Sequence, residues 1–291
     1  MSALEALTRY FRDPVRPDLA IEFTSTALSG ARVEVRSGRR ELAAVASAAL
    51  PEGAFEPALD DPGFAAKEAL REALRALLAR LGAPPDIRAA LIVPDSVVRF
   101  RLFPASEAPP QADRRADLIA FRMQKLLPFP AEDVRVVSAF PRRPEDPALA
   151  LGFSRPVLRA YEHAAEAFGL DVGQVETSTT ALLKGVPGGG DSLLVRHDPR
   201  YLTMALIRDG WPVSIRSFDA SVARLGTEIR REIASTAVFW RDRLAGERRN
   251  RERAEARVAP RRERTVGAAR EREVAPGGDR VVFPSGGERR D

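Results

Sequence analysis

The stretch LAIEFTSTALSGARVEVRSGRRELAAVASAA, residues 19–49, decides the fold of this 291-residue chain. Its apolar runs at 19–23, 31–35 and 41–49 are separated by a polar turn at 24–26 and by a glycine. Neighbouring strands joined by such short turns pair antiparallel. The stretch therefore predicts a three-stranded β-meander.

A helix is expected after this meander. Five leucines between residues 70 and 81 recur at helical spacing, and Gly82 is typical of a helix end. We expect Asp61 to cap the helix and Pro62 to occupy its first position. A buried strand over 87–93 then continues the sheet.

The same order of three strands and a helix returns later in the chain. Strands are predicted at 193–196, 201–208 and 211–218, and the apolar stripe of 221–244 predicts a long helix. The glycine-rich stretch 185–190 separates this second meander from what precedes it. Two similar halves indicate a duplicated α/β architecture.

Further strands and helices are expected between the two meanders. The predicted strands are 97–103, 134–140, 148–153 and 172–175, and the predicted helices are 112–127, 155–168 and 179–184. We expect the helix over 112–127 to turn Leu118, Phe121, Met123 and Leu126 inward.

Composition excludes several kinds of site. The chain has no cysteine, so it can form neither a disulfide framework nor a thiolate metal site, and it has no cysteine nucleophile. Only His163 and His197 are histidines, which excludes a multi-histidine metal centre. No apolar run reaches the ~20 residues of a membrane span, and the first residues lack a signal pattern. We therefore expect a cytoplasmic protein.

The basic charge is concentrated in a tail. Residues 246–291 hold 13 Arg against 9 Asp and Glu, whereas the first 245 residues hold 33 Lys and Arg against 32 Asp and Glu. Apolar periodicity stops near Gly246, which predicts disorder and indicates either a lost final segment or, as we favour, a frameshift. Arginines there alternate with glutamates, so we expect no nucleic-acid binding.

Four segments together resemble the PilM family of type IV pilus assembly proteins. They are Lys125–Val134 (KLLPFPAEDV), Ala165–Leu182, Ile207–Gly210 (IRDG) and Leu225–Arg241. The resemblance covers about residues 19–245. PilM is actin-like and related to FtsA, so the resemblance implies an actin-like, ribonuclease H-like duplicated fold.

That resemblance implies a domain division. We expect an N-terminal helix and linker at 1–18, then a first actin-like half at 19–187 that contains an inserted subdomain at about 88–150. A truncated second half at 188–245 and the disordered tail at 246–291 complete the chain.

The resemblance also places a nucleotide site, which departs from the family pattern. The first phosphate loop, Asp-x-Gly-Ser-Ser in the family, is here Glu22-Phe23-Thr24-Ser25-Thr26. The second, Asp-x-Gly, is aligned with Arg196-His197-Asp198. Thr24 replaces the glycine that lets backbone N–H groups approach a phosphate, and Arg196 replaces a metal-facing carboxylate.

We therefore expect no catalytic residues, no bound metal and no ATPase activity. The degenerate nucleotide site would comprise Glu22, Thr24, Ser25, Thr26, Arg196 and Asp198, and ATP with Mg²⁺ is implied by the family resemblance alone. The turn at 24–26 has a simpler interpretation as a polar hairpin turn without ligand. His197 beside Asp198 suggests general-base chemistry, but no nucleophile pattern accompanies the pair.

The function implied by the resemblance is that of a scaffold of pilus assembly. In that family the protein binds the N-terminal cytoplasmic tail of the inner-membrane protein PilN and so lies against the inner membrane. The tail would occupy a groove between the first subdomain and the inserted one, with Phe100, Phe103 and Phe121 as candidate lining residues; the chain could also oligomerise. The alternative is an actin-like or sugar-kinase-like protein that still binds ATP.

Overall fold

The computed structural model describes residues 16–104, 112–219, and 230–241 without 232 and 239. The chain divides into two compact units, 1–238 and 239–291, and the elements below belong to the first. The predicted N-terminal helix and the predicted disordered tail lie outside the described residues. No helix of the described part is both long enough and apolar enough to cross a membrane.

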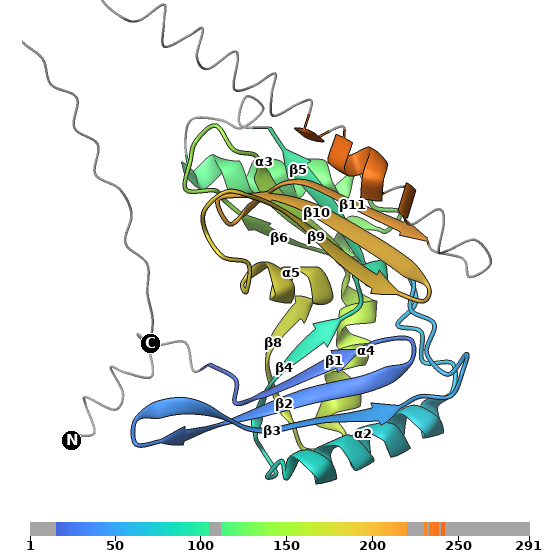
Figure 1. The fold of residues 1–291 in the computed structure, drawn as a ribbon. Helices are drawn as coiled ribbons and strands as arrows, with labels where there is room; N and C mark the ends of the chain where they lie inside the picture. Colours follow the sequence, from blue (N-terminus) through green and yellow to red (C-terminus); the bar gives the residue numbers. More distant parts are fainter. Residues whose placement is uncertain (1–15, 105–111, 220–229, 232, 239, 242–291) are drawn as a thin grey trace, which may run out of the picture. The chain divides into compact units, whose positions relative to one another are not determined.

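The first sheet has five strands in the order β3-β2-β1-β4-β8 (Figure 1). Their bounds are β1 Leu19–Phe23, β2 Ala27–Arg36, β3 Arg39–Ala49, β4 Arg88–Val93 and β8 Asp171–Thr177. β1, β2 and β3 form the predicted antiparallel meander, while β4 and β8 run parallel to β1. An antiparallel meander extended by two parallel strands is the arrangement that we expect for an actin-like half.

Helix α2 (Lys67–Leu81) packs against β2 and β3. Its leucines at 70, 74, 77 and 81 are buried, as their spacing predicts. Gly30 of β2 lies directly beneath the helix, because an added Cβ would stand 2.8 Å from Leu81 Cδ1. Gly82 ends the helix at φ 58°, a conformation that suits glycine.

The expected start of α2 is wrong. The helix begins at Lys67, six residues after Asp61, and its N-cap Ala66 offers no side-chain cap. Asp61 serves the preceding loop instead, where its Oδ1 accepts the N–H of Gly63 at 2.7 Å. Pro62 accepts a hydrogen bond of 2.8 Å from the Tyr161 hydroxyl through its carbonyl oxygen.

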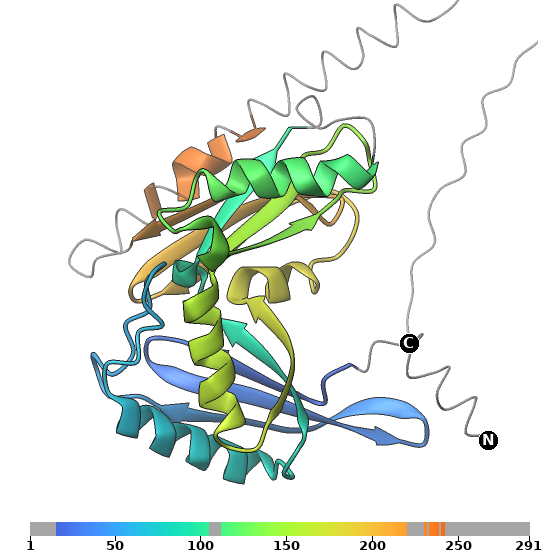
Figure 2. The same cartoon turned by 180° about the vertical axis from the view of Figure 1, so that it is seen from behind.

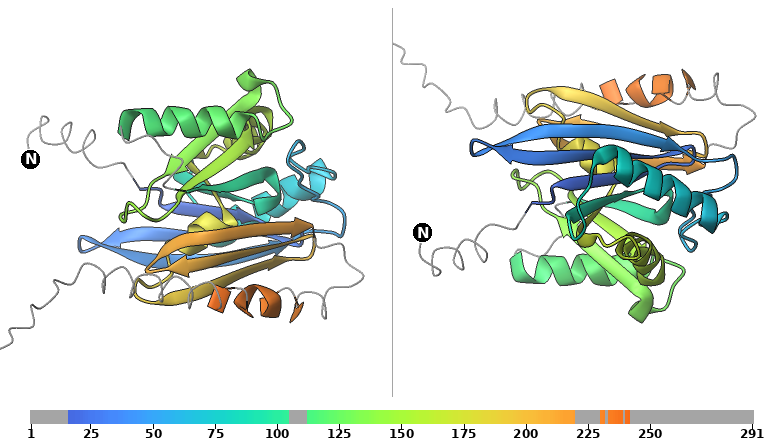
Figure 3. Two further views of the ribbon diagram at one scale, coloured as in Figure 1. Left: turned by 90° about the horizontal axis from the view of Figure 1, so that it is seen from above. Right: turned by 90° about the horizontal axis from the view of Figure 1, so that it is seen from below.

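A second, three-stranded sheet has the order β5-β7-β6 and is antiparallel. Its strands are β5 Val98–Phe103, β6 Val134–Ala139 and β7 Ala148–Ser154, and it contacts helix α3 (Ala112–Gln124) (Figure 3). The short helices η1 (Asp95–Val97) and η3 (Ala131–Asp133) precede β5 and β6. We expected the insert to begin near residue 88, but β4 belongs to the first sheet, so the separate sheet begins at Val98.

The inward face of α3 differs from the prediction. Ile119 and Met123 are buried and pack with Phe103, whereas Phe121 is 55% exposed and Leu126 is 48% exposed. Apolar residues occur all around this helix, so spacing alone did not identify the side that meets the sheet.

A third sheet, β11-β10-β9, is the predicted second meander. Its strands are β9 Asp191–Asp198, β10 Tyr201–Arg208 and β11 Trp211–Asp219. The predicted turn between the last two strands holds Asp209 at φ 49° and Gly210 at φ 79°. The described residues of 230–241 are helical, in agreement with the helix predicted there.

Helices α4 (Arg155–Glu166) and α5 (Ser178–Leu183) complete the described elements (Figure 2). Ser154 caps α4 by accepting the N–H of Val157, and Pro156 lies in the first turn. Tyr161 of α4 is fully buried and packs edge-on against Phe23 of β1, with 5.2 Å between ring centroids. This aromatic contact joins α4 to the core of the first sheet.

Candidate functional site

The candidate site lies where three parallel strands end. β1, β4 and β8 run in the same direction, so the residues that follow them meet at one edge of the sheet. In open α/β sheets this carboxyl edge is where ligands bind. The turn 24–26 follows β1, Asp95 follows β4 and Ser178 follows β8.

The two predicted phosphate loops come together here through Ser25 and Asp198. The Asp198 carboxylate accepts the backbone N–H of Ser25 at 3.1 Å and its hydroxyl at 2.7 Å. It also accepts the N–H of Arg200 at 3.1 Å. Asp198 is 1% exposed, so these three donors replace the water that a carboxylate would otherwise bind.

A second bridge joins Glu22 to Arg196. Arg196 Nη2 lies 3.0 Å from Glu22 Oε1, and the Ser178 hydroxyl donates to the same oxygen at 2.9 Å. The guanidinium thus occupies the place where the resemblance expected a metal-facing carboxylate. Because an arginine repels a cation, this half of the site does not suit Mg²⁺.

The remaining predicted residues are used in the turn itself. The Thr24 hydroxyl donates to the Ala27 carbonyl at 2.9 Å and accepts its N–H at 3.1 Å. Thr26 is exposed, and its carbonyl accepts the N–H of Leu50 at 2.8 Å. The structure therefore brings all six predicted residues together at this edge of the sheet, where they form a polar cluster, while Thr24 and Thr26 bond only to neighbouring backbone.

Sequence reasoning missed a third bridge, between Asp95 and Thr179. The buried Asp95 carboxylate accepts the Thr179 N–H at 3.0 Å and also accepts its hydroxyl. Burial raises the pKa of Asp95 above its ordinary value, although the two Thr179 hydrogen bonds oppose the shift. Part of the signal was available, since Asp95 lies two residues after the predicted buried strand 87–93, whereas Thr179 stood at the start of a predicted helix.

Tyr201 of β10 lies in the same buried polar region. Its side chain is buried, and burial raises its pKa, with the nearby Asp95 and Asp198 charges adding to the shift. The described residues contain no cluster of three or more His, Asp or Glu side chains that could hold a metal ion. The polar cluster is a set of carboxylates, hydroxyls and one guanidinium that bind one another.

The three candidate groove residues do not share one surface. Phe103 is buried beneath α3, and Phe100 is partly buried against the main core. Only Phe121 is exposed, and the Lys125 ammonium lies 4.2 Å from the centre of its ring. A groove lined by all three side chains is therefore excluded by their burial.

Neither a protein-family model nor a curated protein matches the chain at a significant level. Among solved structures, a chain of the PilM–PilN type IV pilus biogenesis complex matches with a TM-score of 0.57 and 16% identity, over 70% of this chain and 62% of that chain. This chain therefore spans less than two thirds of the length of the one it matches.

Two further structures are similar at lower scores. The cytoplasmic domain of EpsL, an inner-membrane component of the Vibrio cholerae type II secretion system, matches with a TM-score of 0.45 and 16% identity, over 69% of this chain and 70% of that one. A Bacteroides thetaiotaomicron protein with an actin-like ATPase fold matches with a TM-score of 0.45 and 11% identity, over 77% and 76%. On its strand order and its similarity to the pilus complex, the chain has a PilM-like, actin-like ATPase fold.

Proposed function

We propose that this chain is a non-catalytic scaffold of the PilM kind, which binds the N-terminal cytoplasmic tail of a PilN-like inner-membrane protein. It works in the cytoplasm and reaches the inner membrane through that partner. The observation that carries the proposal is the fold similarity to the PilM–PilN complex, at a TM-score of 0.57.

The bonding within the polar cluster supports the non-catalytic part of the proposal. An actin-like ATPase needs free backbone donors for phosphate and a carboxylate for Mg²⁺. Here the Ser25 N–H is bonded to Asp198, and Glu22 is paired with Arg196. A nucleotide would have to break both bridges before its phosphates could enter.

The exposed Phe121 is the best candidate contact for the tail among the three phenylalanines named from the sequence. An aromatic side chain that is 55% exposed contributes strongly to affinity when a partner covers it. Lys125 beside it adds a positive charge and hydrogen-bond donors for peptide carbonyl groups.

Calorimetric titration with the synthetic cognate tail tests the proposal. We expect saturable binding, weakened about tenfold by Phe121→Ala because the aromatic contact is lost. Val35→Ala is the matched control, since Val35 is a similarly exposed apolar side chain on β2. Folded protein that binds no tail would contradict the scaffold function.

The neighbouring genes give an independent test. A following gene that encodes a short cytoplasmic tail, one membrane helix and a coiled coil would supply the cognate tail and support the proposal.

The titration with Phe121→Ala separates the function from the contact site. If the tail bound this variant as tightly as wild type, the scaffold function would stand, and the tail would contact residues other than Phe121.

A further inference from the structure

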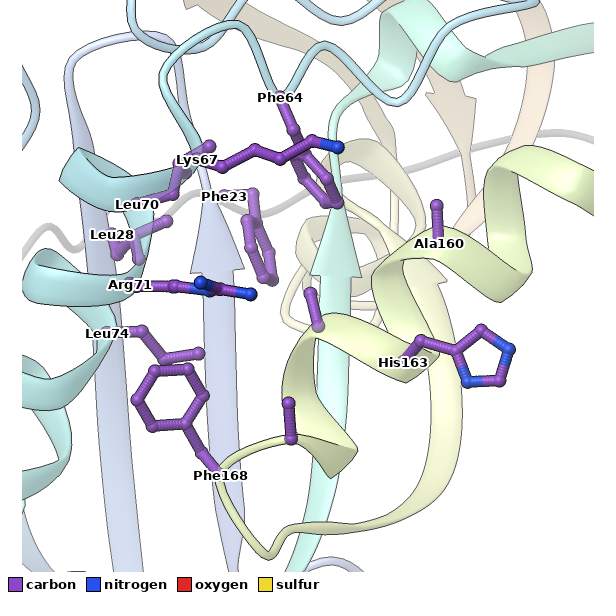
Figure 4. Close-up of a pocket in the computed structure, with 12 residues that line it drawn as sticks. Phe23, Leu28, Phe64, Lys67, Leu70, Arg71, Leu74, Ala160, His163 and Phe168 are labelled. Carbon is purple, nitrogen blue, oxygen red and sulfur yellow. The ribbon is translucent and has the colours of Figure 1, made fainter.

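A groove of about 300 Å³ lies between α2 and α4 on one face of the first sheet (Figure 4). Phe23 of β1 and Leu28 of β2 line it, and these two residues are directly opposed in the sheet. Phe64 and Phe168 also line the groove. It is distinct from the polar cluster around Ser25 and Asp198, because none of the six residues of that cluster lines it.

The groove exists because α4 presents small side chains to it. Ala160, Ala164 and Ala167 line it at helical spacing, opposite Leu70 and Leu74 of α2. Larger residues at these alanine positions would close the space between the helices. Although Phe23, Leu28, Leu70 and Leu74 are themselves buried, an apolar concavity remains between the helices, and such pre-formed apolar concavities are typical of binding sites.

The apolar lining is held rigidly. Phe23 and Phe64 each pack edge-on against Tyr161, with ring centroids 5.2 Å and 5.1 Å apart. The Tyr161 hydroxyl is anchored on the Pro62 carbonyl oxygen at 2.8 Å. A ligand therefore meets a formed site and loses little free energy to ordering it.

The charged side chains that line the groove are basic. Lys67 and Arg71 line it and reach from α2 toward α4, whereas His163 points away (Figure 4). None of the lining residues is acidic. In the described part of the chain Lys67 forms no ion pair, and Arg71 pairs only with the exposed Glu68 at 2.7 Å. An exposed pair of this kind is weak and exchanges easily for another carboxylate.

We propose that this groove binds an acidic amphipathic segment of a partner protein. An apolar side chain such as Leu or Phe enters between Leu74 and Ala164, while Asp or Glu residues next to it pair with Lys67 and Arg71. A peptide fits better than a lipid, because the α2 wall from Lys67 to Leu74 is only about 10 Å long. That length suits one or two side chains.

This binding is separate from the proposed tail contact at Phe121, and its test uses a different peptide. A short fluorescein-labelled peptide that alternates Glu with Leu and Phe is titrated with the full chain, and anisotropy is measured. A second peptide carries Gln at every Glu position. We expect the acidic peptide to bind more tightly than the Gln peptide.

Two variants locate the binding. Ala164→Leu fills the groove and should weaken the acidic peptide at least about tenfold, while Lys67→Glu should weaken it about fivefold and leave the Gln peptide unchanged. Arg114→Glu, the same charge change on the exposed face of α3, is the matched control and should have no effect. Thermal unfolding checks that each variant is folded.

Three results would overturn the proposal. The first is that the wild-type chain binds neither peptide. The second is that it binds both peptides equally tightly. The third is that Ala164→Leu and Lys67→Glu bind the acidic peptide as tightly as wild type. If vesicles of phosphatidylglycerol bind instead, and Lys67→Glu abolishes that binding while the peptide does not bind, the groove faces a membrane and the peptide assignment is wrong.

Discussion

The polar cluster and the α2–α4 groove both involve β1 of the first sheet, and they differ in how their side chains are used. In the polar cluster, the Ser25–Asp198 and Glu22–Arg196 bridges satisfy buried polar groups with one another. In the groove, alanines face leucines across a space that the described residues leave unfilled. The polar groups of the first region already have partners within the chain, whereas the second region retains unfilled space.

This difference teaches that residues predicted to bind a ligand can lie together and yet bond to each other, as Asp198 does with Ser25. A binding surface can then lie elsewhere, where small side chains leave a space unfilled. The predictions below test the two regions against each other.

Removing Asp198 should have the largest effect on stability. Asp198→Ala leaves the Ser25 N–H, the Ser25 hydroxyl and the Arg200 N–H without their acceptor inside the protein. We expect a loss of about 3 kcal/mol in the free energy of unfolding. Urea denaturation measures it, with the exposed Asp60→Ala as control. Equal stability of the two variants would mean that the bridge is not formed.

Two adjacent alanines of α4, Ala165 in the packed core and Ala164 at the groove, allow the two environments to be compared. Ala165 is fully buried, so Ala165→Leu should cost about 1–3 kcal/mol through overpacking. Ala164 lines the groove, so Ala164→Leu should change stability by less than about 0.5 kcal/mol. Thermal unfolding compares the pair. Similar losses in both would show that the groove is closed in solution.

The pH dependence of Asp95 gives the smallest expected effect. Its pKa in the folded chain is raised above 3.8, so folding favours the protonated form. The stability that protonation contributes is complete below about pH 3.8 and is lost as pH rises through the raised folded pKa. Asp95→Asn keeps an acceptor for the Thr179 N–H. Because an amide does not titrate in this pH range, the variant should not lose stability as pH rises through the Asp95 pKa.

Unfolding curves across this pH range test the Asp95 prediction. The stability of Asp95→Asn relative to wild type should increase as pH rises, whereas the exposed control Asp60→Asn should follow wild type. A constant difference between Asp95→Asn and wild type at all pH values would contradict the assignment.

Much of the fold was predictable because its strands alternate clearly and its turns are marked. The meanders at 19–49 and 193–218, and the leucine stripe of α2, follow from local pattern alone. The buried face of α3 could not be predicted in this way, because Phe121 and Met123 are both apolar. Only the packing of the helix against the sheet decides that Met123 is buried and Phe121 exposed.

The site was predictable in part. The loops around Ser25 and Asp198 were identified by resemblance, and the structure joins them. Asp95 and Thr179 were missed, because they become neighbours only when β4 and β8 pair in parallel. The groove was invisible in the sequence, where Ala160 and Ala164 are simply good helix formers.

We propose that the Ser25–Asp198 and Glu22–Arg196 bridges keep a nucleotide out of the polar cluster. Titration of the wild-type chain with Mg²⁺ and ATP, followed by calorimetry and phosphate release, tests it most directly, with Ser25→Ala measured alongside. We expect neither saturable binding nor turnover by either protein. Saturable, Mg²⁺-dependent ATP binding to the wild type that Ser25→Ala abolishes would contradict it.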